Sequence, residues 1–347
     1  MKRYVFFILA VYLILLAIPI PVFFASKSNK PYEGAPHSES PGDNTTQTTA
    51  EDNHPEETAA ENEQAETDVF KVLNIADNRV YELTARELMI GSTAAEMYPT
   101  YHIEALKAQA AAVYSYYCVR RTSQRQNPDA ALNGADFADT NDGFPIYYSV
   151  EQLRERWGDN FDAYYKKMCE AADDVEGKQL AHNGQPVLAI YHSISSGITE
   201  DAATVWGGGY PYLLPVPSPG DKLSPNYESV VSFSPEELRE RIKETAAEFD
   251  PQGDAAEWLG EIEKSESGTV TGVVVGGTEL TGRQLRQALG LRSYCFDVKW
   301  QDGRFYFTVY GYGHNVGMSQ YGADYLARQG SNWMEILKYY YTGITIE

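Results

Sequence analysis

The sequence predicts an α+β fold in which helices and antiparallel sheets form two lobes around a substrate cleft. Two pairs of short alternating segments indicate β-hairpins: Val69–Ile75 with Arg79–Leu83, and Phe296–Trp300 with Phe305–Tyr310. Between these hairpins, apolar residues recur at helical spacing over Glu104–Arg121. Strands joined by such short turns pair in the antiparallel sense, and the long amphipathic segment adds the helical part.

Two helices are expected directly after the first hairpin. Thr84 and Glu87 have the spacing of a capping box, so the first helix begins there and should end near Glu96, before Pro99. The stripe that the second helix buries, over Glu104–Arg121, consists mostly of alanines. Small side chains permit a close approach, so we expect this helix to pack tightly against the first.

The remaining elements follow from turn and cap signals. Ser149 with Gln152 caps a helical stretch that reaches Ala172, and Asn183-Gly184 turns a hairpin between residues 178–181 and 185–192. The run 207–225 is rich in proline and glycine, which favours a long ordered loop. Further expected elements are a helix opened by Ser234, Pro235 and Glu237, a polar connection or short helix at Asp250–Ser267, a strand at Thr269–Val275, and a helix at Thr281–Leu289 stopped by Gly290.

The N-terminal part indicates a membrane anchor followed by a tether. Tyr4–Phe24 is 21 residues without a formal charge, long enough as a helix to cross a bilayer core of ~30 Å. Lys2 and Arg3 precede it, so residues 1–25 are expected to be a cytoplasmic stub and a single transmembrane helix, with the rest of the chain outside the cell membrane. A cleaved signal peptide is the alternative.

Residues 26–68 predict a disordered linker. They hold eleven acidic residues and only two lysines, and such a segment lacks the apolar area to offset its ordering entropy. The globular region is then 69–347, which we divide into an N-terminal part, 69–192, and a C-terminal part, 193–347.

Composition narrows the classes of function. The formal net charge of −21 argues against a nucleic-acid partner. Twenty-six tyrosines suit a sugar-binding cleft, because a tyrosine offers an apolar face and a hydroxyl. Cys118, Cys169 and Cys295 are odd in number and far apart, so they suggest neither a disulfide framework nor a metal site. No metal and no cofactor is expected.

Glu96 is the candidate catalytic residue. Its neighbours Ala94, Ala95 and Met97 offer no side-chain hydrogen bonds, and a helix C-terminus carries partial negative charge. Both conditions favour the protonated carboxyl, and a carboxyl held neutral near pH 7 can act as a general acid. The alternative is a solvated glutamate on a helix surface.

Five segments together carry a family resemblance. They are TAAEMYPTYHIEALKAQAAA (Thr93–Ala112), YHSISSGITEDAATVW (Tyr191–Trp206), PYLLPVPSPGDKLSPNY (Pro211–Tyr227), LTGRQLRQALGL (Leu280–Leu291) and GYGHNVGMSQYGA (Gly311–Ala323). In order and spacing the chain resembles the stage II sporulation protein D family of cell-wall lytic transglycosylases, from about Phe70 to its end. Family members commonly have proline where this chain has Tyr98, glycine where it has Asn315, and an arginine within the stretch that matches Val113–Tyr116.

The resemblance implies a membrane-anchored enzyme that cleaves peptidoglycan during engulfment, with Glu96 as both acid and base. It implies a substrate of glycan strands stripped of stem peptides, and stage II sporulation proteins P and M as partners. We also expect the C-terminal glycine loop, Gly311–Gln320, to converge with Thr93–Glu104 at the cleft. Some relatives carry a zinc site in the region that matches Phe137–Ser149, which here lacks Cys and His. The residues assigned to substrate binding are His192, Ser193, Ser195, Ser196, His314, Ser319, Gln320 and Tyr321, with Lys107, Gln109 and Asp221 as further candidates.

Other assignments compete with these. The two histidines could hydrogen-bond only their own loops, Lys107 and Gln109 could lie on a solvated helix face, and Asp221 with Lys222 could form a surface ion pair. A zinc hydrolase built on the histidines or a Cys-His hydrolase is weakly signalled, because neither a tight ligand cluster nor a nucleophile motif is present. The strongest rival function is a noncatalytic wall-binding protein that recruits or stimulates an amidase.

Overall fold

The computed structural model describes residues 68–141 and 144–347. The predicted anchor, 1–25, and all but the last residue of the predicted linker, 26–68, lie outside the described residues. Within the described part of the chain, no helix is both long and apolar enough to span a membrane. This finding contradicts the predicted single-pass membrane localisation, which is corrected here.

The N-terminal elements start with the predicted hairpin. β1 and β2 pair antiparallel from Val69↔Thr84 to Asn74↔Arg79, and β3 adds to β1 in the parallel sense. The capping box of Thr84 and Glu87 is present at the start of α2, as predicted. Up to residue 192 the elements are β1 (Val69–Asn74), β2 (Arg79–Thr84), α2 (Ala85–Glu96), α3 (Ile103–Gln126), β3 (Phe137–Ala138), β4 (Thr140–Asn141), β5 (Phe144–Pro145), α4 (Val150–Trp157), α5 (Phe161–Asp173), β6 (Leu180–His182), β7 (Gln185–Pro186) and β8 (Tyr191–His192).

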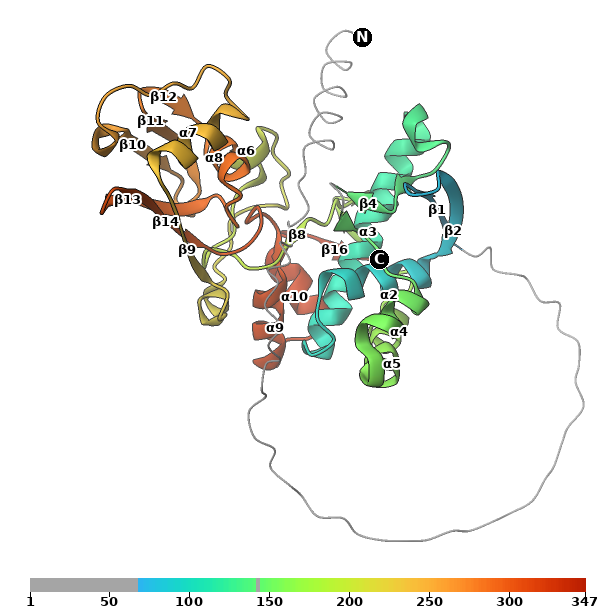
Figure 1. The fold of residues 1–347 in the computed structure, drawn as a ribbon. Helices are drawn as coiled ribbons and strands as arrows, with labels where there is room; N and C mark the ends of the chain where they lie inside the picture. Colours follow the sequence, from blue (N-terminus) through green and yellow to red (C-terminus); the bar gives the residue numbers. More distant parts are fainter. Residues whose placement is uncertain (1–67, 142–143) are drawn as a thin grey trace, which may run out of the picture. The chain divides into compact units, whose positions relative to one another are not determined.

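The C-terminal elements include two three-stranded antiparallel sheets, with strand orders β10-β11-β12 and β13-β14-β9. The predicted hairpin of residues 296–310 is confirmed, and it forms the β13-β14 pair. The described chain is therefore α+β, as predicted (Figure 1). The elements are α6 (Ala202–Trp206), β9 (Glu228–Phe233), α7 (Pro235–Lys243), β10 (Leu259–Lys264), β11 (Val270–Val275), β12 (Thr278–Leu280), α8 (Gly282–Leu289), β13 (Cys295–Gln301), β14 (Arg304–Tyr310), β15 (Met318–Ser319), α9 (Gln320–Arg328), α10 (Trp333–Tyr340) and β16 (Thr345–Ile346).

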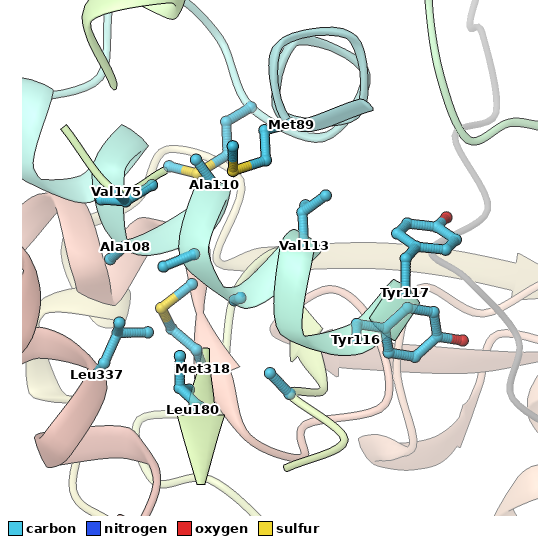
Figure 2. Close-up of a cluster of buried hydrophobic side chains, with 14 of the residues drawn as sticks. Met89, Ala108, Ala110, Val113, Tyr116, Tyr117, Val175, Leu180, Met318 and Leu337 are labelled. Carbon is cyan, nitrogen blue, oxygen red and sulfur yellow. The ribbon is translucent and has the colours of Figure 1, made fainter. Parts of the chain in front are cut away.

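The helix α3 lies at the centre of the larger hydrophobic cluster. It packs against α2, α5, α9 and α10 (Figure 1), and Ala105, Ala108 and Ala111 are fully buried along it. Figure 2 shows Met89 of α2 beside Ala110 among the small side chains of this helix. The predicted close packing of α2 and α3 is confirmed, because alanines let neighbouring backbones approach.

A second hydrophobic cluster is built from residues 233–309. Phe249, Phe296 and Phe305 are fully buried in it, together with Leu238 of α7 and Leu285 of α8. The larger cluster takes its residues from both sides of this segment, from 70–216 and from 316–346. The division at residue 192 stays a prediction.

Some elements differ from the predictions. The predicted stretch from Ser149 to Ala172 is two helices, α4 and α5, because Gly158 takes a left-handed φ of 50° between them. The segment Asp250–Ser267, expected to be a polar connection or a short helix, contains a short 3-10 helix at Ala255–Glu257 and, in addition, the strand β10. Most residues of β10 are exposed at the edge of its sheet, so its sequence lacks the apolar alternation that identifies a half-buried strand.

Candidate functional site

Glu96 is the last residue of α2. The next residue, Met97, is the C-cap: its N–H still donates to the carbonyl of Thr93, and its backbone is already extended. The Nε2 of Gln320, 224 residues further along the chain, donates to Oε2 of Glu96 at 3.3 Å. The end of α2 and the start of α9 therefore meet at this carboxyl group.

Glu96 as a whole residue is partly exposed, whereas its carboxyl group, which contacts Gln320, is desolvated. Burial raises the pKa of Glu96 to about 7, and the hydrogen bond from Gln320 opposes that rise. Burial raises the pKa values of the buried phenols of Tyr117 and Tyr191 well above their usual range, and the nearby Glu96 charge raises them further. At neutral pH the site thus holds a carboxyl that readily takes either charge state, beside neutral hydroxyls.

The start of α9 is held by a short parallel pairing. β15 pairs with β8 through Met318↔Tyr191 and Ser319↔His192, and Ser319 caps α9 by accepting from the N–H of Gly322 at 3.1 Å. Gln320 is the first residue of α9. The predicted convergence of Thr93–Glu104 with the C-terminal glycine loop is confirmed by the contact between Gln320 and Glu96.

Asp221 connects its own loop to the loop after β8, through Ser195, and to the start of α9, through Ser319. Its carboxylate accepts from the N–H of Ser195 at 3.0 Å, from the Ser195 hydroxyl, and from the Ser319 hydroxyl at 2.8 Å. Asp221 is fully buried, and burial raises its pKa to about 6. The alternative of a surface ion pair with Lys222 is wrong, because burial and these donors hold Asp221 inside the protein.

The two predicted histidines are buried and engaged by backbone groups. Nδ1 of His192 contacts the carbonyl of Val316 at 3.0 Å, and Nδ1 of His314 accepts from the N–H of Val316 at 3.1 Å. Burial lowers the pKa of His192 to about 4 and the pKa of His314 well below its usual range. Both are therefore neutral and hold the glycine loop against β8, and direct contact with a saccharide stays a prediction for them.

The conformation of the glycine loop depends on two positions. Asn315 has a φ of 69°, so the left-handed backbone expected there is confirmed. Its side chain accepts from the N–H of Ser196 at 3.0 Å and donates to the carbonyl of Ile198 at 3.0 Å. At Gly317, a Cβ would lie 2.1 Å from the carbonyl oxygen of Ile190, so only glycine fits beside β8.

The other assigned residues divide by exposure. Ser193, Ser196 and Tyr321 are partly exposed, and the N–H of Tyr321 donates to the carbonyl of Ser193 at 3.1 Å. Ser195 and Ser319 are fully buried, so in this structure they hold the loops together. Whether any of these side chains binds substrate stays a prediction.

Lys107 and Gln109 do not lie on a freely solvated face. Gln109 is fully buried, and both of its amide atoms are without a hydrogen-bond partner. Lys107 is partly buried and pairs with Glu104 and Asp174, each at 2.7 Å. The solvated face expected for this part of α3 is wrong, because α3 is surrounded by α2, α5, α9 and α10.

A metal centre finds no support in residues 68–141 and 144–347. No group of three or more His, Cys, Asp or Glu side chains there is placed to hold a metal ion.

Sequence reasoning missed Tyr117 and Tyr191, which lie near Glu96. The signals in the sequence were the high tyrosine content of the chain and, for Tyr191, its position at the start of a segment that carries the family resemblance.

The chain is similar in sequence to a known protein family. A family model described as Stage II sporulation protein matches residues 76–182. Stage II sporulation protein D of Bacillus amyloliquefaciens is 33% identical over 347 residues, which cover 100% of this chain and 96% of that protein. The protein of the same name from Bacillus subtilis (strain 168) is 34% identical over 298 residues, 86% of this chain and 84% of that protein. The chain belongs to the stage II sporulation protein D family.

The family model covers only part of the candidate site, whereas the match to a full-length family member covers all of it. The segment matched by the family model includes Glu96 and α3, whereas Asp221 and Gln320 lie beyond it. The match to the Bacillus amyloliquefaciens family member extends over the whole chain and so covers both parts. A protein named Amidase enhancer, from Bacillus subtilis (strain 168), is 25% identical over 302 residues, covering 72% of this chain and 39% of that protein.

Proposed function

We propose that this protein is a peptidoglycan lytic transglycosylase that acts during engulfment in sporulation. It would cleave the β-1,4 bond between N-acetylmuramic acid and N-acetylglucosamine and leave 1,6-anhydro products. The observation that carries the proposal is Glu96, a helix-terminal carboxyl whose pKa is raised to about 7 by burial. Membership of the sporulation family supports the biological setting.

One carboxyl group suffices for this reaction. Protonated Glu96 donates its proton to the glycosidic oxygen as the bond from that oxygen to C1 of the muramic acid breaks. The resulting carboxylate accepts the proton of the 6-hydroxyl of the same sugar, and O6 bonds to C1. Glu96 ends protonated, and no water is consumed.

The surroundings of Glu96 support this division of labour. Glycosidases that use water or a covalent intermediate usually need two carboxyl groups about 5 to 9 Å apart. Asp221, the other buried carboxyl of the assigned site, is already occupied by donors from Ser195 and Ser319. Tyr117 and Tyr191 are neutral phenols that cannot replace a carboxylate base.

Substrate and partners complete the proposal. Glu96 and Gln320 would line a cleft between two lobes, with the partly exposed Ser193, Ser196 and Tyr321 beside the sugar. The family resemblance supports glycan strands without stem peptides as the substrate, and stage II sporulation proteins P and M as partners. No nucleic acid and no cofactor is part of the proposed reaction.

The test is to incubate the full chain with denuded glycan strands and identify the new chain ends by mass spectrometry. We expect 1,6-anhydromuramic ends from the wild type and none from Glu96→Gln. Glu248→Gln, at an exposed position beyond α7, is the matched control and should remain active. Reducing ends would identify a hydrolase, and the absence of products from the wild type would contradict catalysis.

A second candidate is a noncatalytic protein that binds the wall and stimulates an amidase. The similarity to a protein named Amidase enhancer favours it. Peptide release from intact peptidoglycan by a purified amidase distinguishes the two, with and without this chain. Equal stimulation by wild type and Glu96→Gln, without any anhydro ends, would support the second candidate.

A further inference from the structure

We propose that Tyr98, Tyr101 and Tyr321 form an aromatic surface that binds a sugar ring of the glycan strand next to the bond cleaved at Glu96. This inference rests on the proposed function and names a binding surface for its substrate. Tyr98, which contributes the most exposed ring, is the residue that makes it testable.

The three rings form a continuous row. The ring centroids of Tyr98 and Tyr101 are 6.3 Å apart with planes at 80°, and those of Tyr101 and Tyr321 are 6.5 Å apart with planes at 85°. One end of the row lies two residues after Glu96, and the other lies directly after Gln320, the residue that contacts Glu96. The row therefore connects the two chain segments that meet at the carboxyl group.

Tyr98 differs from most tyrosines of the described chain in its exposure. It is 57% exposed, whereas Tyr101 and Tyr321 are only partly exposed. A large ring left in water at a protein surface is unfavourable by its apolar area. Because Tyr98 is exposed while Tyr101 and Tyr321 are packed against the protein, the row can bind a sugar ring without a prior change of conformation.

The connector that carries Tyr98 and Tyr101 is held from two helices. Lys167 of α5 donates to the carbonyl of Pro99 at 2.9 Å and to that of Tyr101. From α9, Arg328 donates to the carbonyl of Thr100 at 3.3 Å, and Asp324 accepts from the N–H of His102. Three consecutive carbonyls are thus fixed by cations, so the exposure of Tyr98 is not that of a loose loop.

The chemistry of this surface fits a sugar ring. Aromatic faces pack against the C–H groups of a pyranose, while phenolic hydroxyls exchange hydrogen bonds with sugar hydroxyls and N-acetyl groups. Burial, together with the nearby carboxylate of Asp324, raises the pKa of Tyr101, so its hydroxyl stays neutral. Lys167 and Arg328 point their charges at backbone carbonyls of the connector. The surface accordingly offers aromatic rings and phenolic hydroxyls.

The experiment measures binding separately from cleavage. In the full chain carrying Glu96→Gln, the affinity for denuded glycan oligomers is measured by titration calorimetry, with and without Tyr98→Ala. We expect Tyr98→Ala to weaken binding by about two- to tenfold, as for the loss of one aromatic contact. Tyr98→Phe and Tyr98→Trp should retain the parent affinity because they keep a ring. Tyr339→Ala, which removes an exposed tyrosine on α10, is the matched control and should bind as the parent does.

Each contrary result has a separate meaning. Unchanged glycan affinity in Tyr98→Ala would overturn the inference and leave the proposed function standing; the exposed ring would then be assigned to a protein contact. A loss in Tyr98→Phe as large as in Tyr98→Ala would also overturn it, because the hydroxyl and not the ring would carry the contact. If the parent itself failed to bind glycan, the proposed function would fail first. Equal thermal unfolding of all variants verifies that folding does not explain a loss.

Discussion

At the scale of single residues, two opposing effects set the charge of Glu96. Burial favours the neutral carboxyl, and the amide of Gln320 favours the carboxylate because it donates a hydrogen bond to it. Burial is the larger effect, and the balance lies near pH 7. An acid that must give up one proton and accept another in a single turnover works best near that balance.

The hydrogen bond from Gln320 predicts a change in pH dependence. Glu96 must be protonated when the reaction starts, so kcat/KM should fall as pH rises above about 7. Gln320→Ala removes a donor that stabilises the carboxylate, so the pKa of Glu96 rises and the alkaline fall moves to higher pH. Gln329→Ala, at the exposed other end of α9, should leave the profile in place. A profile of kcat/KM against pH checks both, and a shift to lower pH would contradict the assignment.

The raised pKa of Glu96 also predicts a cost in stability. The pKa is about 7 in the folded chain against an ordinary value of 4.5, so between these values the folded state binds the proton more tightly and stability falls as pH rises. Above pH 7 the cost reaches on the order of 3 kcal/mol. Glu96→Gln should therefore be more stable than wild type at pH 8 and nearly equal at pH 4. Urea unfolding at the two pH values measures this, with Glu248→Gln as the unchanged control.

At the scale of elements, helix starts follow from short sequence signals. The capping boxes predicted at Thr84, Ser149 and Ser234 are all present. They are predictable because a cap joins residues only three positions apart. The strands β8 and β15 are two residues each, and their pairing joins positions 127 residues apart. No local pattern identifies such a pairing.

The two kinds of helix start predict different mutational costs. Thr84→Ala removes one exposed cap and should lower the free energy of unfolding by about 1 kcal/mol. Ser319→Ala removes the cap of α9 and one donor to the buried carboxylate of Asp221, so it should cost about 2 to 3 kcal/mol. It should also lower activity, because Gln320 follows directly. Chemical denaturation and the glycan assay test this, and equal costs for the two variants would contradict the role given to Asp221.

At the scale of the whole described chain, the site depends on contacts between distant segments. Hydrogen bonds connect the loop after β8 to residues 233–309, the segment that contains the second hydrophobic cluster. The Ser196 hydroxyl donates to the carbonyl of Ser267 at 2.9 Å, and the Ser267 hydroxyl donates to that of Thr199 at 2.9 Å. The glycine loop contacts the loop after β8 through Asn315, which accepts from the N–H of Ser196 and donates to the carbonyl of Ile198. Loops from both sides of residues 228–309 are thereby joined.

The close passage of Gly317 over β8 gives a prediction at this scale. Gly317→Ala combines a φ of 72° with a Cβ only 2.1 Å from the carbonyl oxygen of Ile190. We expect a loss of more than about 2 kcal/mol in unfolding free energy and a loss of activity. Gly330→Ala has a φ of 101° but open space around its Cβ, so it should cost about 1 kcal/mol and leave activity unchanged. Urea unfolding compares the two variants. Similar losses of unfolding free energy would contradict the prediction, because they would show that the backbone around Ile190 shifts to accommodate the added Cβ.

The sequence by itself determined the α+β class, the hairpins, most helix starts and the apolar setting of Glu96, because each depends on residues near one another in the chain. Only the tertiary structure decided that Gln320 contacts Glu96, that Gln109 and Asp221 are buried, and that both histidines are held by backbone groups. These outcomes depend on which surfaces of distant segments exclude water together. The type of a residue does not by itself show whether it will be buried, because burial depends on which distant segments pack around it.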